Sequence, residues 1–288
     1  MRNPAPAATV TPAPAPDLAD YDVCLVNSSA GKDSQAMLDV VVAAARAAGV
    51  LDRVVVVHAD LGEAEWPGTA ELAAEHAAHY GLRFEIVARR RDGRVETILE
   101  RVAARGMFPD AARRWCTSDH KRGPVRTLMT RLAAEQRAAG LVERPVRLLN
   151  VLGLRAAESS ARRRQLPYAV DRPASNGRRH VDTWLPIHTW STAEVWQRIQ
   201  RAGTRPHPAY AAGMSRLSCR FCVLASRADL ICSARHNPDL AAAYAAVEQH
   251  TGHRFRQDLS MGEILAAAAA PDEPDRRAEQ IALFPAQF

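Results

Sequence analysis

The sequence predicts an α/β protein in which a parallel sheet of about five strands is covered by helices on both faces. Short runs rich in β-branched residues, such as residues 21–27 and 52–60, are typical of buried parallel strands. Alanine-rich segments with helical spacing, several of them ending at glycine, lie between these runs. In a sheet built this way, ligands bind beyond the carboxyl ends of the strands.

The predicted elements alternate along the first half of the chain. Strands are expected at residues 21–27, 52–60, 83–89 and 145–155. Helices are expected at residues 33–49, 68–81, 95–106, 121–140, 190–203 and 238–252. Ser191 followed by Glu194 is a capping box, which marks the start of the fifth helix.

The pattern changes after residue 185, so we divide the chain into an α/β domain over residues 20–185 and a helical, cysteine-containing part over 186–270. Residues 1–19 are rich in proline and alanine and predict a disordered tail, and residues 271–288 predict a second tail. The chain has no apolar run of the roughly 18 residues that span a bilayer, and its start does not resemble a signal peptide. We therefore expect a cytoplasmic protein without membrane contact.

Charge and cysteine content narrow the function classes. The net charge of +6 comes mostly from arginine, with clusters at residues 89–91 and 162–164. Such clusters are either solvated surface or a surface that meets phosphate groups, and charge alone does not choose between them. An odd count of five cysteines without a secretion signal argues against a disulfide framework. Cys24 lies in an apolar run and is expected to pack in the core.

The loop between the first strand and the first helix, SAGKDS at residues 29–34, is typical of an anion-binding turn. It lacks the spacing of a Walker loop and the three glycines of a dinucleotide fingerprint. Its form resembles the Ser-Gly-Gly-Lys-Asp-Ser loop of the ATP pyrophosphatase superfamily, with Ala30 in place of the first glycine. Alanine adopts a left-handed conformation only with strain, so Ala30 is the irregular position of the loop.

Four further segments resemble phosphoadenosine phosphosulfate (PAPS) reductase-like proteins, in the order of that family. The segments are HADLGEAEWPGT (58–69), RRWCTSDHKRGPV (113–125), GLRAAESSARRR (153–164) and LPIHTWSTAEVW (185–196). With the loop, they extend the resemblance from residue 21 to about residue 225. The family implies an adenine nucleotide alpha hydrolase-like (HUP) fold, with ATP, PAPS or adenylylsulfate as the bound nucleotide.

The resemblance and elementary chemistry together predict a nucleotide site. Lys32, Asp60 and Arg155 are expected to be catalytic, with Lys32 and Arg155 stabilising phosphate charge. Asp33 and Asp60 are candidates for holding Mg²⁺ or for fixing the loop. The remaining predicted nucleotide-binding residues are Ser29, Gly31, Ser34, Gly62, Lys121, Glu158 and Arg162. Alternatively, Asp33 caps a helix and residues 162–164 form a solvated face.

Four cysteines form a second candidate site. Cys219 and Cys222 are a Cys-x-x-Cys pair, with Cys232 ten residues further on and Cys116 far upstream. Four thiolates suit either zinc or a [4Fe–4S] cluster, and Cys219 with Cys222 could instead form a redox dithiol or pack in the core. The arrangement is similar to that of the ATP pyrophosphatase branch of DNA phosphorothioation, which implies a [4Fe–4S] cluster. The C-terminal cysteine segment of assimilatory PAPS reductases is missing.

Three functions follow from these observations. The first is an ATP pyrophosphatase that releases pyrophosphate and activates an acceptor, such as DNA or tRNA, for sulfur transfer, with a cysteine desulfurase as a natural partner. The second is a reductase that converts PAPS or adenylylsulfate to sulfite. The third is a non-catalytic nucleic-acid-binding subunit with structural zinc, for which salt-sensitive binding would be the signature.

Overall fold

Four of the six strands of the central sheet are the apolar segments that were predicted from the sequence. The computed structural model describes residues 15–270 and contains a six-stranded sheet, with five parallel strands and one antiparallel strand at an edge. In order across the sheet the strands are β3 (Arg83–Ala88), β2 (Val54–Asp60), β1 (Val23–Ser28), β6 (Val146–Val151), β8 (Arg179–Trp184) and the antiparallel β7 (Tyr168–Val170). The predicted fold class, a parallel sheet flanked by helices, is confirmed.

The strands β7 and β8 were not predicted. The sequence of β8 carries Arg179 and Asp182 where an apolar residue is expected, yet both side chains are buried. The Arg179 guanidinium donates to the Ala174 carbonyl at 2.8 Å, and the Tyr21 hydroxyl donates to Asp182 at 2.8 Å. Because these hydrogen bonds offset the cost of burial, a strand with charged residues can lie inside the sheet.

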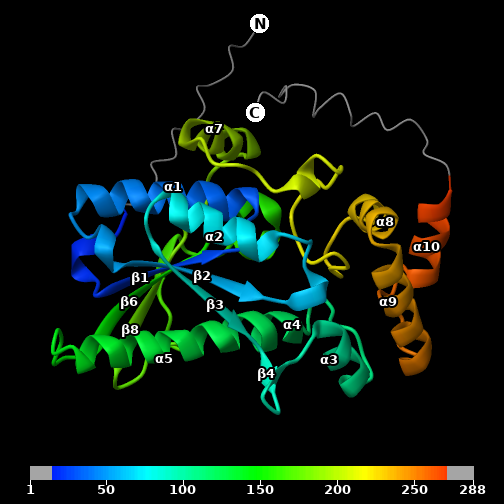
Figure 1. Ribbon diagram of the computed structural model, residues 1–288, viewed down its shortest axis with the longest axis horizontal. Helices are drawn as coiled ribbons and strands as arrows, with labels where there is room; N and C mark the ends of the chain where they lie inside the picture. Colours follow the sequence, from blue (N-terminus) through cyan, green and yellow to red (C-terminus); the bar gives the residue numbers. More distant parts are fainter. Residues whose placement is uncertain (1–14, 271–288) are drawn as a thin grey trace, which may run out of the picture.

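Helices cover both faces of the sheet (Figure 1). On one face lie α1 (Lys32–Ala47), α2 (Thr69–His79) and α7 (Thr192–Ala202). On the other face α5 (Gly123–Ala138) packs Leu128 and Leu132 against the strand residues Leu25 and Val57. Although α7 follows the domain boundary predicted after residue 185, it packs on α1 and shares the core of the first face through Val195 and Ile199.

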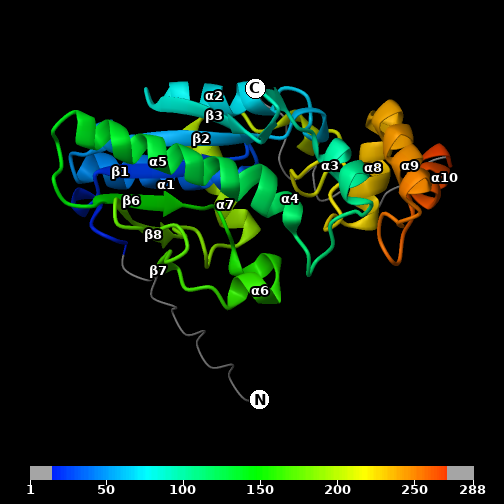
Figure 2. The ribbon, with the colours of Figure 1, turned by 90° about the horizontal axis from the view of Figure 1, so that it is seen from below.

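A separate apolar core lies beyond the carboxyl ends of the strands (Figures 1 and 2). It is formed by α3 (Ile98–Arg105) together with α8 (Arg227–His236), α9 (Pro238–Thr251) and α10 (Met261–Ala269). The rings of Phe108, Tyr244 and Phe255 contact one another at its centre. Of these helices, α8 and α10 were not predicted.

Short elements connect these layers. They are the hairpin of β4 (Arg90–Arg91) and β5 (Arg94–Val95), the single turn α4 (Trp115–Thr117) with the π-helical turn Ser118–Arg122, and α6 (Ser160–Arg163). Most of the predicted N-terminal tail and all of the predicted C-terminal tail lie outside the described residues. Within residues 15–270 no helix combines the length and the apolar character that crossing a membrane requires.

Candidate functional site

The predicted loop lies where the strand order of the sheet reverses. β1 has β2 on one side and β6 on the other, so the segments after β1 and β6 diverge at the same edge. The Asn27 amide joins the two strand ends, because it donates to Asn150 Oδ1 at 2.8 Å and to the Val151 carbonyl at 3.0 Å. A Cβ atom on Gly153 would lie 3.0 Å from the Asp33 carbonyl, so glycine allows this close approach.

The loop is held by its own serines. Ser34 Oγ accepts from the Ser29 amide at 3.1 Å and donates to the Gly31 carbonyl at 2.9 Å. Gly31 is the N-cap of α1, so the amides of the first helical turn face the loop. Ala30 has a φ of +54°, the left-handed conformation that the sequence marked as unfavourable for alanine. Its methyl group is buried against Leu72 and Ala73.

Five of the predicted charged residues form three ion pairs, in two groups that Arg155 links. Asp33 contacts Lys32 at 3.3 Å and Arg155 at 2.6 Å, so one carboxylate bridges two cations. Glu158 pairs with Arg162 and accepts from the Arg155 amide at 3.0 Å. Burial raises the pKa of Glu158, but the Arg155 amide and the Arg162 charge outweigh it, so the net shift of this pKa is downward. The three cations that were predicted to bind phosphate are therefore each paired with a carboxylate.

Tyr210, which the sequence did not single out, covers the loop. Its hydroxyl accepts from the Lys32 amide at 2.8 Å, the position at which a helix N-terminus binds an anion. The Lys32 ammonium lies 5.7 Å from the centre of the Tyr210 ring. Leu217 lies against Gly31, since a Cβ atom there would be 3.3 Å from that side chain. The segment 204–217 thus occupies the space in front of the loop.

The end of β2 carries a buried histidine, His58, which pairs with Glu65 from the following segment beside the loop. His58 Nδ1 lies 3.0 Å from the Ser28 carbonyl and Nε2 lies 2.9 Å from Glu65. Burial opposes protonation of His58, but the hydrogen bond and charge of Glu65 outweigh it and raise its pKa. Asp60 Oδ1 accepts from the Gly62 amide at 2.7 Å, so this carboxylate fixes its own turn.

Three of the four predicted cysteine ligands lie together. Cys116, Cys219 and Cys222 are half-buried and pack against the core that contains α8–α10. Lys121 lies among them: its burial favours the neutral amine, but nearby Cys219 and Glu65 raise its pKa. Burial raises the pKa of Cys219 to about 12, and it also raises that of Cys116. We call Cys116, Cys219 and Cys222 the cysteine triad.

Cys232 is placed apart from the cysteine triad. Its thiol donates to the Ala212 carbonyl at 3.1 Å and packs against Trp66 and Met214. Across residues 15–270 no three His, Cys, Asp or Glu side chains are arranged to hold a metal ion. The four-thiolate set predicted from the spacing is therefore not assembled. Cys232 instead contacts the segment that precedes the Cys-x-x-Cys pair.

Sequence reasoning also overlooked a compositional signal. Of the 38 Lys and Arg residues, Lys32 and Lys121 are the only lysines. Both lie in predicted sites; Lys32 is buried and Lys121 is half-buried. A lysine is a compact charge on a flexible chain, and it differs from arginine in how readily its pKa shifts. By contrast, no sequence signal marks Tyr210, because its contact with Lys32 spans 178 residues.

Comparisons with protein families and with curated proteins each gave a match. A family model described as phosphoadenosine phosphosulfate reductase domain matches residues 23–225. An uncharacterised 37.8 kDa protein of Escherichia phage 186 is 28% identical over 126 residues, which are 44% of this chain and 34% of that protein. The chain thus matches about a third of the length of this curated relative.

Solved structures that resemble the chain include two nucleotide enzymes. A phosphoadenylyl-sulfate (PAPS) reductase from Candida auris, in a phosphate complex, is 17% identical with a TM-score of 0.42, covering 69% of this chain and 82% of the other. An FMN adenylyltransferase from Candida glabrata, in complex with FAD and pyrophosphate, is 13% identical with a TM-score of 0.41, covering 69% of this chain and 55% of the other.

Proposed function

Because the chain belongs to the phosphoadenosine phosphosulfate reductase domain family, we propose that it is a nucleotide-processing enzyme that binds ATP at the loop after β1 and releases pyrophosphate. The observation that carries the proposal is the group of Lys32, Asp33 and Arg155 around the loop at the point where the strand order reverses. Such a point is where sheets of this class bind nucleotides.

The proposed reaction is an adenylyl transfer. An acceptor oxygen attacks the α-phosphorus of ATP, the bond to the bridging oxygen breaks, and pyrophosphate leaves with that oxygen. Lys32 and Arg155 would stabilise the charge that develops on the phosphate oxygens. Their common partner Asp33 holds both cations at the loop before the nucleotide arrives. A sulfur nucleophile then displaces AMP from the activated acceptor.

ATP can use the helix N-terminus only after Tyr210 withdraws. The hydroxyl of Tyr210 holds the Lys32 amide, and Leu217 lies against Gly31. Binding of a phosphate group therefore exchanges one hydrogen bond for a charge-assisted one, which is about twice as strong. We expect the segment 204–217 to move outward when nucleotide binds.

The proposed Mg²⁺ ion fits Asp60 better than Asp33. Both oxygens of Asp33 already have cationic partners, whereas Asp60 Oδ2 has no hydrogen-bond partner within residues 15–270. Mg²⁺ is usually held by one or two carboxylates together with the phosphates of the substrate. When bound, the ion would neutralise phosphate charge, and Asp60 is the residue of this chain that would hold it.

The proposed sulfur chemistry is assigned to the cysteine triad without an iron–sulfur cluster. A four-thiolate cluster, or a four-thiolate zinc site, would require Cys232 to leave the Ala212 carbonyl and join the other three cysteines. As arranged, the residues do not fit that group, so no step of the reaction depends on it. Anaerobic purification with iron, sulfide and zinc analysis, repeated on Cys219→Ala, tests this assignment directly.

The acceptor class and partner follow from the phosphorothioation-type resemblance. We propose DNA, with tRNA as the second nucleic acid to test, and a cysteine desulfurase as the source of sulfur. A sulfonucleotide reductase is the competing enzyme class, and it would need one of the cysteines as a nucleophile. Sulfite released from PAPS or adenylylsulfate by the purified protein would favour that alternative.

Calorimetric titration with ATP and Mg²⁺ tests the proposal. Lys32→Ala should weaken ATP binding by about tenfold or more, because a charge-assisted hydrogen bond to phosphate is worth about 1.5–3 kcal/mol. Arg172→Ala, an exposed arginine outside the site, is the matched control. Because the chain has only two lysines, acetylation by an amine reagent followed by peptide mass spectrometry should show ATP protecting Lys32. Equal ATP binding by wild type and Lys32→Ala would refute the site.

A further inference from the structure

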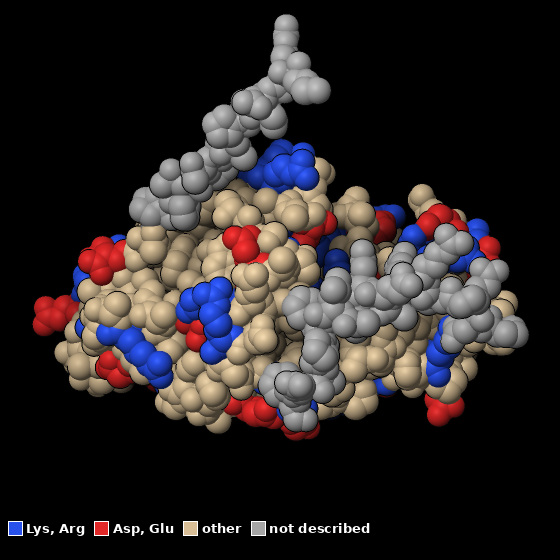
Figure 3. Space-filling view, turned by 90° about the horizontal axis from the view of Figure 1, so that it is seen from above, with Lys and Arg blue, Asp and Glu red and all other residues tan. Residues whose placement is uncertain are grey.

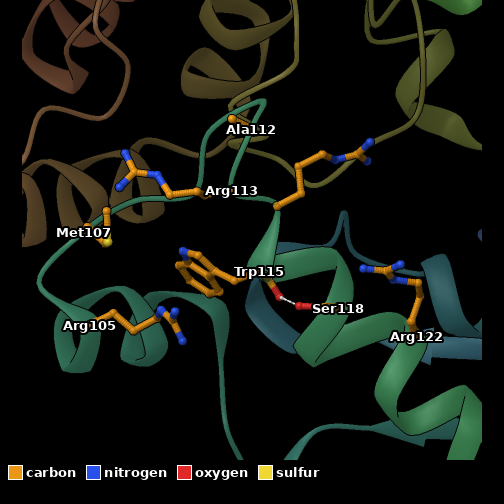
Figure 4. A pocket seen from close by; sticks show the side chains of 8 residues that line it. Arg105, Met107, Ala112, Arg113, Trp115, Ser118 and Arg122 are labelled. Carbon is orange, nitrogen blue, oxygen red and sulfur yellow. Dashed lines mark hydrogen bonds between the residues drawn. The ribbon is translucent and has the colours of Figure 1, made fainter. Parts of the chain in front are cut away.

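A basic cavity lies outside the nucleotide site, between the end of α3 and the turn α4. Its volume is about 360 Å³, and Figure 4 shows the side chains that line it. Four of the lining residues are arginines, and the fifth large side chain is a tryptophan; they are Arg105, Arg113, Arg114, Arg122 and Trp115. The proposed function uses none of these five side chains.

Two of the four arginines carry uncompensated charge. Arg105 and Arg113 have carboxylate partners, Asp119 at 3.8 Å and Asp110 at 2.9 Å. Within residues 15–270, neither Arg114 nor Arg122 has an ion-pair partner, and both side chains are exposed. On the face seen in Figure 3, by comparison, several basic groups lie beside acidic ones. Unpaired guanidinium groups at the mouth of a cavity favour an anionic ligand, such as phosphate, in which two oxygen atoms can accept hydrogen bonds from one guanidinium.

Trp115 adds an unused hydrogen-bond donor. The residue is 7% exposed, and its indole Nε1 is buried without a partner in the described structure. The Arg105 guanidinium lies 5.3 Å from the centre of the Trp115 ring and stacks on its face. Buried donors normally find an acceptor, so a ligand oxygen or base atom in this cavity would satisfy the indole.

A second cavity continues the first, which indicates an elongated ligand. It has a volume of about 600 Å³ and shares Ala112 and Arg113 with the arginine-lined cavity. Its other wall contains the apolar side chains Val223, Leu224 and Phe255 together with charged residues, among them the Arg256–Asp258 ion pair. A chain of alternating phosphates and flat bases matches this alternation of arginines with apolar and aromatic groups.

Both cavities adjoin the cysteine triad along the chain. Trp115 of the first cavity precedes Cys116, and Cys222 precedes Val223 of the second cavity. A polymer lying across Arg113 would therefore pass beside the residues to which the proposed function assigns sulfur chemistry. Because the cavities lie near these cysteines, the ligand of the cavities is more readily explained as the acceptor of the proposed reaction than as an unrelated anion.

We infer that the two cavities on either side of Arg113 bind the phosphodiester backbone and bases of a nucleic acid, with Arg114 and Arg122 as phosphate contacts and Trp115 as a further donor. Its role as the acceptor site rests on the proposed function, whereas the binding itself does not. Free nucleotide phosphate is the other source of the same chemistry, and the experiment separates the two.

Fluorescence anisotropy of a labelled 20-nucleotide DNA with the full chain, without ATP, tests the inference across a salt series. Arg114→Ala with Arg122→Ala should lower the affinity about tenfold or more and reduce the salt slope by about two, one for each lost phosphate contact. The matched control is Arg172→Ala with Arg178→Ala. These substitutions remove the same charge from exposed positions near the amino end of β8, on the side of the sheet away from the cavities. They should change the affinity less than about threefold.

Trp115→Phe is the second variant, because it keeps the ring and removes the donor; it should weaken binding about threefold. Unlabelled oligonucleotide should compete, and AMP or inorganic phosphate should not at equal phosphate concentration. Equal loss in both arginine pairs, no binding by wild type, or full competition by AMP would overturn the inference. Because ATP is absent, failure of the ATP proposal leaves this result unaffected.

Discussion

The loop after β1 and the arginine-lined cavity beside α4 both contain several cations, but they differ in whether those cations are paired with carboxylates. At the loop, Lys32 and Arg155 share Asp33, so each of these cations has a carboxylate partner in the absence of ligand. At the cavity, Arg114 and Arg122 have no carboxylate within residues 15–270. The loop cations are buried, whereas the cavity cations are exposed.

This difference separates two ways of binding phosphate. A buried cation must be paired even when the site is empty, since an unpaired buried charge is strongly destabilising. An exposed cation is solvated and can remain unpaired, so it is free to meet phosphate at a cost in salt sensitivity. The paired cations of the loop therefore favour a ligand bound in one fixed position. The unpaired cations of the cavity favour long-range attraction and binding of a flexible polyanion.

The largest expected effect comes from breaking the pairing at the loop. Arg155→Met should lower the free energy of unfolding by about 2 kcal/mol, because the half-buried Asp33 carboxylate loses its closest charged hydrogen-bond donor and keeps only Lys32. Arg114→Met, which loses no carboxylate partner, should change it by less than about 0.5 kcal/mol. Urea unfolding at pH 7 measures both. Equal losses in the two variants would contradict the contrast between the two regions.

The next effect concerns access to the loop. Tyr210→Phe should raise the affinity for pyrophosphate about fivefold, because the ligand no longer competes with a hydrogen bond worth about 1 kcal/mol. Tyr80→Phe removes a hydroxyl that donates to Asp39 and serves as the control. Calorimetric titration with pyrophosphate measures the change. An affinity that stays constant or falls in Tyr210→Phe would show that the hydroxyl does not obstruct the anion site.

A smaller effect should appear as pH dependence. The pKa of Glu158 is lowered in the folded state, so the protein gains stability from this carboxylate above the unfolded pKa, near 4.5. That contribution is lost as pH falls through the folded-state pKa. Glu158→Gln should therefore flatten the fall in stability below about pH 4.5, measured by urea unfolding across pH 3–6. If the loss of stability below about pH 4.5 is the same in Glu158→Gln and wild type, the ion pair between Glu158 and Arg162 is absent in solution.

The smallest effect is expected at Ala30. Ala30→Gly should relieve about 1–2 kcal/mol of left-handed strain. Loss of a buried methyl group, about 0.8 kcal/mol, and the flexibility of glycine, about 0.5–1 kcal/mol, nearly offset that gain. The net change should be within about 0.5 kcal/mol. Ala30→Val, a branched residue at positive φ, should instead cost about 2 kcal/mol or more in the same unfolding measurement.

The strands and motifs with local signals were predictable. β1 and β2 begin as continuous apolar runs, which are recognisable as strands. The residues after them could be predicted to lie at a ligand site, because a parallel sheet binds ligands at the carboxyl ends of its strands. The cysteine pair Cys219 and Cys222 was recognisable from its spacing alone. The strand β8 was not predictable from local sequence. The hydrogen bond that stabilises its buried Asp182 comes from Tyr21, which is 161 residues away in the chain.

The sequence by itself determined the parallel sheet, the loop at residues 29–34 and the irregularity of Ala30, since each depends on neighbouring residues and on backbone preference. Only the tertiary structure decided that Tyr210 covers the loop and that Cys232 lies apart from the cysteine triad. It also decided that Arg114 and Arg122 have no carboxylate partner in the part of the chain that the structure describes. Those outcomes depend on contacts between segments far apart in the chain, and local patterns carry no information about such contacts.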